Sequence, residues 1–511
     1  MISVTDKSGI VELARGLIGL GFEIVSTGGT RALLEREGIA AREVKDLTGV
    51  PEMLDGRVKT LHPKVHGGIL ARRDKPGHLA EMAEHGIGAI DVVCVNLYAF
   101  DQAAAKPGLA FDEVVEEIDI GGPALLRAAA KNHSFVLPLV DPADYPEILR
   151  ALAAGEVSAA QRRALALKVF RHTSRYDAAI ARWLESQLSP PGTAPETLMV
   201  EAPRAQLLRY GENPHQAAAV YRDRSPPPAS LVGAKQLGGK ELSFNNLLDA
   251  DAALGLAMDL GGTTAVYVKH NNPCGVASRP SLAEAVKLAR DVDPVSAFGA
   301  VIAVTAEVDK AAAEVLGETF VEVIVAPRFS PEAVEVLGVK KNLRLLELGP
   351  LSAPEARGAE LRRIRGGWLW QGADVHPNVR QEVEGARTAS KRAPTDAERR
   401  ALRYAWTVAK HVRSNAIVFS LEDRVVAVGA GQMSRVDSVA LCRMKAGEKL
   451  KGTVVASDAF FPFRDGVDLL AAAGATAIAQ PGGSVRDDEV IQAADEHQVA
   501  MLLTGVRHFR H

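Results

Sequence analysis

Short apolar runs alternate with segments of helical apolar spacing over residues 1–185, and this alternation predicts an α/β domain. Residues 2–4, 22–25 and 90–95 are the predicted strands. The helical spacing predicts helices over residues 7–20, 31–37 and 124–131, and a helix-rich stretch over 142–187 closes the domain.

Beyond residue 188 the pattern is interrupted and then resumes. Residues 189–203 are rich in proline and small residues and lack periodicity, which predicts a linker. Further along, predicted strands cover residues 265–269, 322–326, 413–419, 425–428, 475–479 and 500–503, and predicted helices cover 282–290 and 401–412. Residues 374–399 are charged and poor in large apolar side chains, so a connection or an exposed helix is expected there. No repeat of fixed period is visible.

The stretch TTAVYVKHNNPCGV, residues 263–276, places two chemically useful side chains at the end of a buried strand. The predicted strand stops on Lys269 and His270 and breaks by Pro273, because proline cannot continue a ladder. The carboxyl ends of strands are where α/β folds usually bind ligands. The pair can stabilise an oxyanion and accept a proton from a nucleophile. The alternative is a strand that ends in two solvated residues.

Glycine turns and basic residues mark a second candidate site near the amino terminus. The turn STGGT, residues 26–30, lies between a predicted strand and a predicted helix, as a phosphate cradle requires. A tight connection without function has the same pattern. The segment DGRVKTLHPKVHGG, residues 55–68, lacks periodicity and is predicted to be an ordered basic loop, with a solvated loop as the alternative. His62 and His66 are four residues apart, but no HExxH pattern supports a metal site.

Two further segments carry polar groups at predicted element ends. Asp119 precedes the predicted helix 124–131, and Lys131 ends it, where a cation is also favoured by the helix dipole alone. The terminal sequence TGVRHFRH follows the predicted strand 500–503. It is either a docked functional segment or a frayed, solvated end.

Composition places limits on the kind of protein. A chain of 511 residues suggests two to four domains, and 47% hydrophobic and 24% charged residues are typical of soluble globular proteins. The net charge of −3 gives no reason to expect a nucleic-acid partner. The three cysteines form no disulfide framework, which fits a reducing compartment. Neither a signal peptide nor a transmembrane helix is expected, so the cytoplasm is the predicted location.

Fourteen stretches, in order along the whole chain, resemble one family: the bifunctional purine-biosynthesis proteins that join AICAR transformylase to IMP cyclohydrolase. They include STGGT, GRVKTLHPKVHGGILARRD, IDIGGPALLRAAAKNH, LRYGENPHQ, VKHNNPCG, RSNAIV, GAGQMSR, SDAFFPFRD and RHFRH. One such stretch alone would carry little information. The collinear set identifies the chain as a member of the family.

The resemblance implies an α/β fold in several parts. Residues 1–188 would form a methylglyoxal-synthase-like parallel-sheet domain, and 204–373 and 374–511 would be two cytidine-deaminase-like subdomains of the transformylase, after a linker at 189–203. It also implies a homodimer with transformylase sites shared between subunits. Zinc deaminases use a PCxxC signature, but no second cysteine lies near Pro273-Cys274, so no metal is expected. The resemblance leaves open whether a monovalent cation binds near the transformylase region.

The resemblance implies that one site transfers a formyl group from 10-formyltetrahydrofolate to AICAR, giving formyl-AICAR and tetrahydrofolate. His270 is the candidate base, Lys269 its electrostatic partner, and Asn415 the group that orients the ribotide. Ribotide contacts are carried over onto Arg209, Tyr210, Gly299, Glu322, Arg435 and Phe509, and folate contacts onto Val436, Phe460 and Arg507. Asn246 and Asp465 are weaker candidates. Glu322 stands where some members of the family have aspartate.

The other site would close the purine ring of formyl-AICAR to give IMP. The resemblance carries the reacting-atom roles over onto Lys131, Lys59, Tyr98 and Asp119. It carries ribotide binding over onto Thr5, Asp6, Lys7, Thr27, Gly28, Gly29, Thr30, Arg57, Val58, Thr60, Asn96 and Ile120. Two rival interpretations remain: a single-activity lyase on the amino-terminal domain, and a nucleotide-sensing regulatory module.

Overall fold

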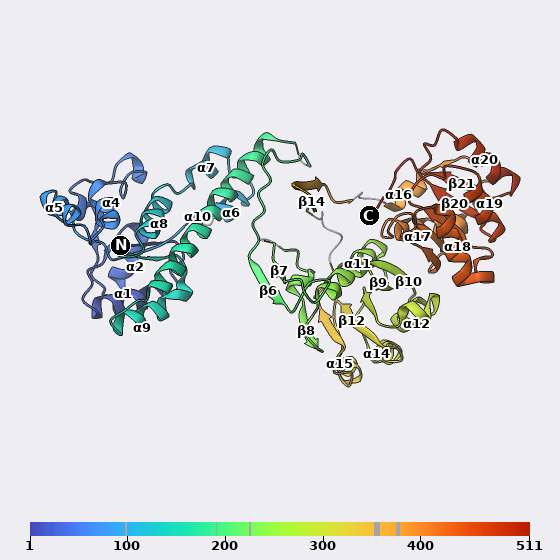
Figure 1. The fold of residues 1–511 in the computed structure, drawn as a ribbon, viewed down its shortest axis with the longest axis horizontal. Helices are drawn as coiled ribbons and strands as arrows, with labels where there is room; N and C mark the ends of the chain where they lie inside the picture. Colours follow the sequence, from blue (N-terminus) through green and yellow to red (C-terminus); the bar gives the residue numbers. More distant parts are fainter. Residues whose placement is uncertain (98–99, 191, 224–225, 352–357, 375–378) are drawn as a thin grey trace. The chain divides into compact units, whose positions relative to one another are not determined.

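The structure, a computed structural model, describes residues 1–511 except 98–99, 191, 224–225, 352–357 and 375–378 (Figure 1). The chain forms two compact units, Met1–Glu201 and Ala202–His511, which are described separately. Residues of the predicted linker return to the first unit: the Glu196 amide donates to Glu185 at 3.2 Å, and Glu201 lies 3.8 Å from Arg175. The finer predicted boundaries stay predictions.

The first unit is built on a parallel sheet of five strands, in the order β3-β2-β1-β4-β5. The strands are β1 (Ile2–Val4), β2 (Val25–Ser26), β3 (Arg42–Glu43), β4 (Val92–Asn96) and β5 (Leu137–Leu139). From β1 the chain builds outward through β2 and β3, and then returns to add β4 on the other side. The strand order therefore reverses between β1 and β4, where open α/β sheets form their ligand crevice.

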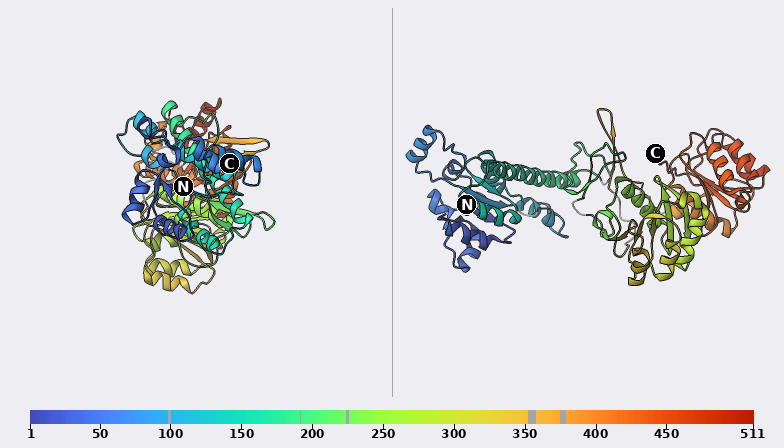
Figure 2. Two further views of the ribbon diagram at one scale, coloured as in Figure 1. Left: turned by 90° about the vertical axis from the view of Figure 1, so that its left-hand side faces the viewer. Right: turned by 60° about the horizontal axis from the view of Figure 1, so that its bottom comes forward.

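Helices cover both faces of this sheet. They are α1 (Ile10–Gly19), α2 (Gly28–Arg36), α3 (Val44–Thr48), α4 (Pro63–Leu70), α5 (Pro76–Glu84), α6 (Phe100–Ala104), α7 (Phe111–Glu116), α8 (Gly121–Lys131), α9 (Tyr145–Ala153) and α10 (Ala159–Leu188). Val92 and Cys94 pack into one core with α1 and α9, whereas Val93 and Val95 pack into the other with α4, α8 and α10. Figure 2 shows α10 as the long helix of this unit. This burial on both faces explains the continuous apolar run of β4.

The prediction of a loop over residues 55–68 is wrong, because α4 begins at Pro63. Proline is favourable at the first helical position, and His62 Nδ1 caps the helix by accepting from the Lys64 amide at 3.1 Å. The helix contains Gly68 because a Cβ there would lie 2.3 Å from the Gly88 carbonyl oxygen. Gly68, at the end of the predicted loop, thus permits close packing within a helix.

The second unit contains two six-stranded sheets, in the orders β10-β9-β11-β12-β13-β8 and β16-β21-β20-β19-β17-β18. The first comprises β8 (Lys235–Gly238), β9 (Thr264–Lys269), β10 (Asn272–Ser278), β11 (Ala300–Val304), β12 (Val321–Ala326) and β13 (Arg344–Glu347). The second comprises β16 (Arg387–Thr388), β17 (Ile417–Ser420), β18 (Val425–Gly429), β19 (Val454–Ser457), β20 (Ala477–Gln480) and β21 (Ala500–Leu503). Two separate hairpins complete the described strands: β6 (Arg204–Leu208) with β7 (Ala218–Tyr221), and β14 (Glu360–Ile364) with β15 (Gly367–Gln371).

The two sheets share one topology, although the sequence shows no repeat of fixed period. Each has an antiparallel hairpin, β9–β10 or β17–β18, whose first strand pairs antiparallel with the first of three parallel strands. The helices are α11 (Phe244–Leu260), α12 (Leu282–Val292), α13 (Pro294–Ala297), α14 (Lys310–Gly317) and α15 (Pro331–Gly338) in the first half, and α16 (Val379–Glu384), α17 (Asp396–Ala409), α18 (Arg435–Ala446), α19 (Asp465–Ala472) and α20 (Asp487–Glu496) in the second. Side chains of α11, α17 and both sheets form one continuous core, so the halves are joined by packing.

Two predictions in this unit are wrong. The chain does not leave the sheet at Pro273: it turns and continues as β10, a strand at the edge of its sheet with a register shift at Pro273. Edge strands and bulges are where proline is tolerated. The charged stretch 374–399 is not simply exposed either, because α16 buries Glu382 and Val383 against the core. None of the helices in the described parts of the chain is long and apolar enough to cross a membrane.

Candidate active sites

Asn96, buried at the end of β4, fixes the loop that follows β1. Its Oδ1 accepts from the amides of Thr5 and Asp6 at 2.6 and 3.0 Å, and its Nδ2 donates to the Asp6 carbonyl at 3.0 Å. Both strands end at the point where the strand order reverses. The predicted ribotide residues after β1 and at the end of β4 are therefore adjacent.

The turn after β2 joins the same group. Thr30, which is also buried, exchanges hydrogen bonds with the main chain of Val4, and Lys7 Nζ donates to the Val4 carbonyl at 2.8 Å and to Thr30 Oγ1 at 3.3 Å. Partial burial lowers the pKa of Lys7. The helix α2 begins at Gly28, earlier than predicted, and a Cβ on Gly28 or Gly29 would meet no atom within 4 Å. The glycines leave open space at the amides of a helix start, a geometry suited to a phosphate.

A second group surrounds Asp119 at the start of α8. Asp119 Oδ1 accepts from the Gly122 amide at 2.8 Å, and the Asp119 amide donates to Tyr176 Oη at 2.7 Å. A Cβ on Gly121 would lie 2.8 Å from Thr60 Oγ1, so the segment 57–60 packs against this turn. Burial raises the pKa of Asp119, and the turn amides and the charge of Lys59 oppose that rise. A carboxyl group with a raised pKa is suited to proton transfer.

Other predicted residues of this unit lie around these groups. Arg57 is exposed and forms an ion pair with Glu116, Val58 pairs with Met53 across a short bridge, and Ile120 is 63% exposed. Lys131 is at the far end of α8, an 11-residue helix, so about 15 Å of helix separates it from the start where Asp119 lies. The contacts of the described residues do not bring Lys131 to Asp119. Tyr98 lies outside the described residues.

In the second unit, Lys269 and His270 end one strand of a tight hairpin. Lys269 pairs with Asn272, which leaves a two-residue turn, and both of its residues have positive φ: 53° at His270 and 60° at Asn271. Lys269 Nζ donates to the Phe298 carbonyl at 2.7 Å. A Cβ on the next residue, Gly299, would be 4.0 Å from the Lys269 Nζ.

The expected place of the pair in the sheet needs correction. Since β9 is antiparallel to β11, the end of β9 lies at the amino edge of the parallel strands β11–β13. Glu322, near the start of β12, accepts from Asn246 Nδ2 at 2.7 Å and lies 3.8 Å from Arg344. The site is built between this edge and the start of α11.

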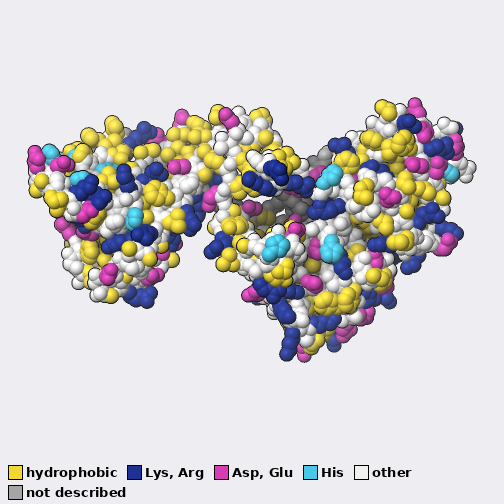
Figure 3. Space-filling model, viewed as in Figure 1, with side chains coloured by type: hydrophobic (Ala, Val, Ile, Leu, Met, Phe, Trp, Pro, Cys, Tyr) yellow, Lys and Arg dark blue, Asp and Glu magenta, His cyan; other side chains and the backbone are white. Residues whose placement is uncertain are grey.

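Arg209 and Tyr210 lie in the loop between β6 and β7. The Arg209 guanidinium stacks on the Tyr210 ring at 4.8 Å and donates to its hydroxyl at 3.0 Å. Asn245 Nδ2 contacts the Glu212 carbonyl at 3.5 Å, which links this loop to the start of α11. Figure 3 shows histidine and basic side chains close together on the visible face of the second unit.

The remaining transformylase candidates gather in the second half of the unit. The Asn415 amide and side chain both donate to the Gln432 carbonyl, at 3.2 and 2.8 Å. Arg435, beside Val436 at the start of α18, donates to the buried Asp458 at 2.9 Å and to Ser457 Oγ at 3.1 Å. Phe460 follows on the same loop and is half-buried.

The carboxyl-terminal segment docks against this group, as one of the two alternatives predicted. The guanidinium groups of Arg435 and Arg507 lie 5.9 and 4.5 Å from the Phe509 ring centroid. The Ser414 amide donates to the Arg510 carbonyl at 2.9 Å. The two halves also meet, because Asn272 Oδ1 accepts from the Arg413 amide at 3.0 Å. The lysine–histidine turn is thereby tied to the segment that carries Asn415.

Comparison with known proteins is decisive for the family. The model of the "AICARFT/IMPCHase bienzyme" family matches residues 129–445, and that of the "MGS-like domain" matches residues 9–124. The bifunctional purine biosynthesis proteins PurH of Myxococcus xanthus and Sorangium cellulosum are 52% and 51% identical to the chain, over 100% of it and 99% of each relative. The chain belongs to the AICARFT/IMPCHase bienzyme family. A solved structure, "Crystal structure of ForH", is 44% identical over 37% of this chain and 97% of that one, with a TM-score of 0.35.

Membership in the AICARFT/IMPCHase bienzyme family confirms the predicted fold class and function. The amino-terminal region is an MGS-like α/β domain. The chain is a bifunctional enzyme of purine biosynthesis, with AICAR transformylase and IMP cyclohydrolase activities. Among the described residues, no group of three or more His, Cys, Asp or Glu side chains is arranged to hold a metal ion.

Two residues of this AICARFT/IMPCHase chain were not predicted from the sequence to take part in a site. His508, between the predicted contacts Arg507 and Phe509, is 2% exposed, and its ring nitrogens lie 2.7 Å from Asp374 and 2.9 Å from Glu382. Asp249 on α11 accepts from both amides of the His270–Asn271 turn. Alternation along RHFRH could have indicated an inward His508, but no local signal pairs Asp249 with residue 270.

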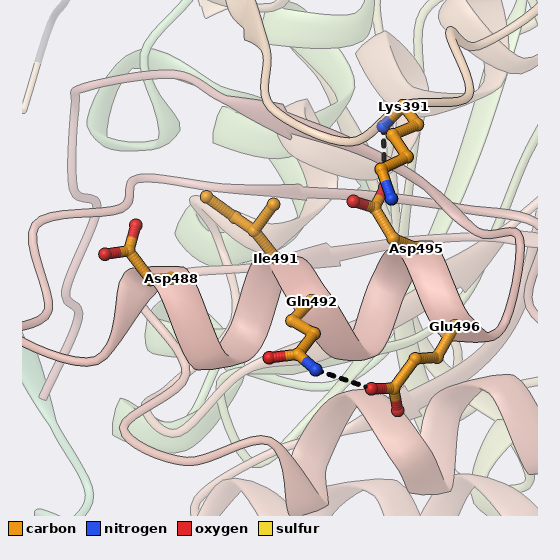
Figure 4. Close-up of a pocket in the computed structure, with 6 residues that line it drawn as sticks. All are labelled: Lys391, Asp488, Ile491, Gln492, Asp495 and Glu496. Atoms are coloured by element: carbon orange, nitrogen blue, oxygen red, sulfur yellow. Dashed lines mark hydrogen bonds between the residues drawn. The ribbon is translucent and has the colours of Figure 1, made fainter.

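A surface hollow of about 360 Å³ beside α20 contains none of the predicted site residues (Figure 4). Its lining residues are Lys391, Asp488, Ile491, Gln492, Asp495 and Glu496. The lining contains three carboxylates and a single ammonium group, so the hollow repels the phosphate and carboxylate groups that this family's substrates carry.

Proposed function

We propose that His270 removes the proton from the 5-amino group of AICAR as that amine attacks the formyl carbon of 10-formyltetrahydrofolate. The observation that carries the proposal is the hairpin tip, where His270 follows Lys269 and the next strand residue, Asn272, accepts from the Arg413 amide of the segment that carries Asn415. The amine is conjugated with the imidazole ring and is a weak nucleophile, so the site must take its proton as the bond forms.

The roles of the neighbouring groups follow from their charge. Lys269, fixed through the Phe298 carbonyl, stabilises the developing oxyanion or protonates the departing folate nitrogen. Asn415 orients the reacting part of the ribotide. Arg209, Tyr210, Gly299, Glu322, Arg435 and Phe509 hold the ribotide, and Val436, Phe460 and Arg507 hold the folate. Phe460 offers an apolar face for the pterin ring, and Arg507 a cation for a carboxylate.

The first unit closes the purine ring of formyl-AICAR. The carboxamide nitrogen attacks the formyl carbon and water is lost, so the site must hold the reactants close and move protons. The open glycine amides of α2, with Thr5–Lys7 and Thr27–Thr30, fit the ribose phosphate. Asp119 with its raised pKa, Lys59 and Tyr98 serve the reacting atoms. Lys131 remains a proposed proton-transfer group, to be tested separately because it lies at the far end of α8.

We further propose a cytoplasmic homodimer with shared transformylase sites, which binds neither nucleic acid nor membranes. The net charge of −3 supports the absence of a nucleic-acid partner. The folate is a co-substrate, and no metal is required. Whether a monovalent cation binds near the transformylase site is left open.

The test is to incubate the purified protein with AICAR and 10-formyltetrahydrofolate and to follow both folate consumption and IMP formation. Both are expected. Ribotide binding without turnover would favour the nucleotide-sensing module. A lyase reaction of the first unit, with no folate consumed, would favour the single-activity enzyme.

A further inference from the structure

The two-residue turn at His270 and Asn271 has a conformation that its own side chains disfavour. Both residues have positive φ, and neither of them is the glycine that such hairpin turns usually contain. A left-handed conformation costs about 1–2 kcal/mol per residue for an ordinary L-amino acid, and somewhat less for asparagine. The surrounding structure must therefore hold the turn in place.

Asp249, on the second turn of α11, supplies that support. Its Oδ1 accepts from the Asn271 amide at 2.6 Å, and its Oδ2 lies 3.3 Å from the His270 amide. The amides of the two central turn residues are not used by the strand ladder, so one carboxylate satisfies both donors. Hydrogen bonds to a charged acceptor are roughly twice as strong as neutral ones.

The helix α11 supports two parts of the site from one face. Asn246 and Asp249 are three residues apart, which places them side by side on the helix. Asn246 binds Glu322 at the start of β12, and Asp249 binds the turn. The position of His270 relative to the proposed ribotide contacts is thus set by a single rigid element.

We propose that Asp249 is a positioning residue for formyl transfer, whose carboxylate holds the strained His270–Asn271 turn and so directs the His270 imidazole at the amine of the ribotide. The inference rests on the proposed function, because it takes His270 as the base. Burial raises the pKa of Asp249, which the turn amides and the charge of His270 oppose. These same contacts favour the ionised form, which can accept from both amides.

The experiment compares Asp249→Ala and Asp249→Asn in the full-length enzyme. For Asp249→Ala we expect kcat of formyl transfer to fall about 10- to 100-fold, the usual consequence of a displacement of about 1 Å. KM for the folate should change little, and cyclisation of supplied formyl-AICAR should be unchanged. Asp249→Asn keeps one acceptor oxygen and should lie between wild type and alanine. Asp251→Ala, an exposed aspartate on the same helix, is the matched control and should match wild type.

The decisive variant is Asn271→Gly in the Asp249→Ala background. Glycine adopts positive φ without strain, so it should restore a large part of the lost kcat. An equal loss with and without Asn271→Gly, or an unchanged kcat in Asp249→Ala, would overturn the inference.

A separate variant distinguishes failure of this inference from failure of the proposed function. If His270→Ala abolishes formyl transfer while Asp249→Ala leaves kcat unchanged, only the positioning role is wrong. If His270→Ala retains full formyl transfer, the assignment of the base is wrong. Circular dichroism and the retained cyclisation activity report whether each variant is folded.

Discussion

The side chains of Lys269 and His270 differ in whether they are already hydrogen-bonded within the protein. The Lys269 ammonium is committed to the Phe298 carbonyl, whereas no hydrogen bond of the His270 ring is found among those of the described residues. His270→Ala should therefore remove a group that is free to act on substrate, and lower kcat of formyl transfer about 10²–10⁴-fold. Cyclisation of supplied formyl-AICAR should continue at the wild-type rate.

The matched control is His497→Ala, which removes an exposed histidine of the same unit that pairs with Asp468 on the surface. It should leave both rates unchanged. Equal loss of both activities in His270→Ala, with the fold intact, would show that the two reactions do not use separate sites.

His508 is a residue whose charge should stabilise the fold. Burial alone would lower its pKa, but hydrogen bonds to Asp374 and Glu382 raise the pKa to about 9. Because the folded pKa lies above the unfolded value of about 6.5, the stabilisation, about 3 kcal/mol, is fully present below about pH 6.5 and is lost as pH rises through about 9. His508→Gln should be less stable than wild type at pH 6.5.

Urea denaturation of the second unit at several pH values measures the effect. The difference in free energy of unfolding between wild type and His508→Gln should shrink as pH rises from 6.5 to 10. A constant difference over that range would mean that the imidazole is neutral in the fold and acts only by packing.

At the scale of elements, the start of α8 shows how a helix positions Asp119, the proposed catalytic carboxylate of the first unit. The Gly122 amide donates to Asp119, and a Cβ on Gly122 would lie 2.2 Å from Asp119 Oδ2 and 2.8 Å from Leu97. Gly122→Ala should displace the carboxylate and slow cyclisation at least about 10-fold, while formyl transfer is unchanged. Gly77→Ala in α5 is the control, since a Cβ there meets no atom within 4 Å. An unchanged cyclisation rate would show that the position of Asp119 is not critical.

The helices and strands also show which features of the fold could be predicted from the sequence and which could not. The buried strands β4, β9 and β12 were predictable, because a continuous apolar run has few other structures in an α/β protein. Two of the errors lie at prolines: Pro63 starts a helix and Pro273 lies in an edge strand, and both contexts depend on neighbours in space. The residues that support the sites could not be predicted either, because their partners are neighbours in space and not in sequence. His508, for example, contacts Asp374, which lies 134 residues away along the chain.

At the scale of the molecule, the predicted site residues fall into two sets, one in each compact unit. Thr5, Asn96 and Asp119 belong to the first unit, which has its own cores, whereas Lys269 and Asn415 belong to the second. The second unit is a topological duplication, yet α11, α17 and both of its sheets share one core. The physical division of the chain therefore falls near residue 201, and a cut between the two halves of the second unit would expose that shared core.

This arrangement predicts that the two activities can be separated. Residues 1–201, expressed alone, should cyclise formyl-AICAR, and residues 202–511 should formylate AICAR without forming IMP, because each fragment keeps its own core and its own site. Mixing the fragments should restore IMP formation from AICAR. A fragment of residues 202–373 should be insoluble or unfolded, since it would expose the apolar face that α17 covers. Steady-state assays and circular dichroism of the fragments test this. Loss of cyclisation in a folded fragment 1–201 would mean that the first site needs groups from the second unit.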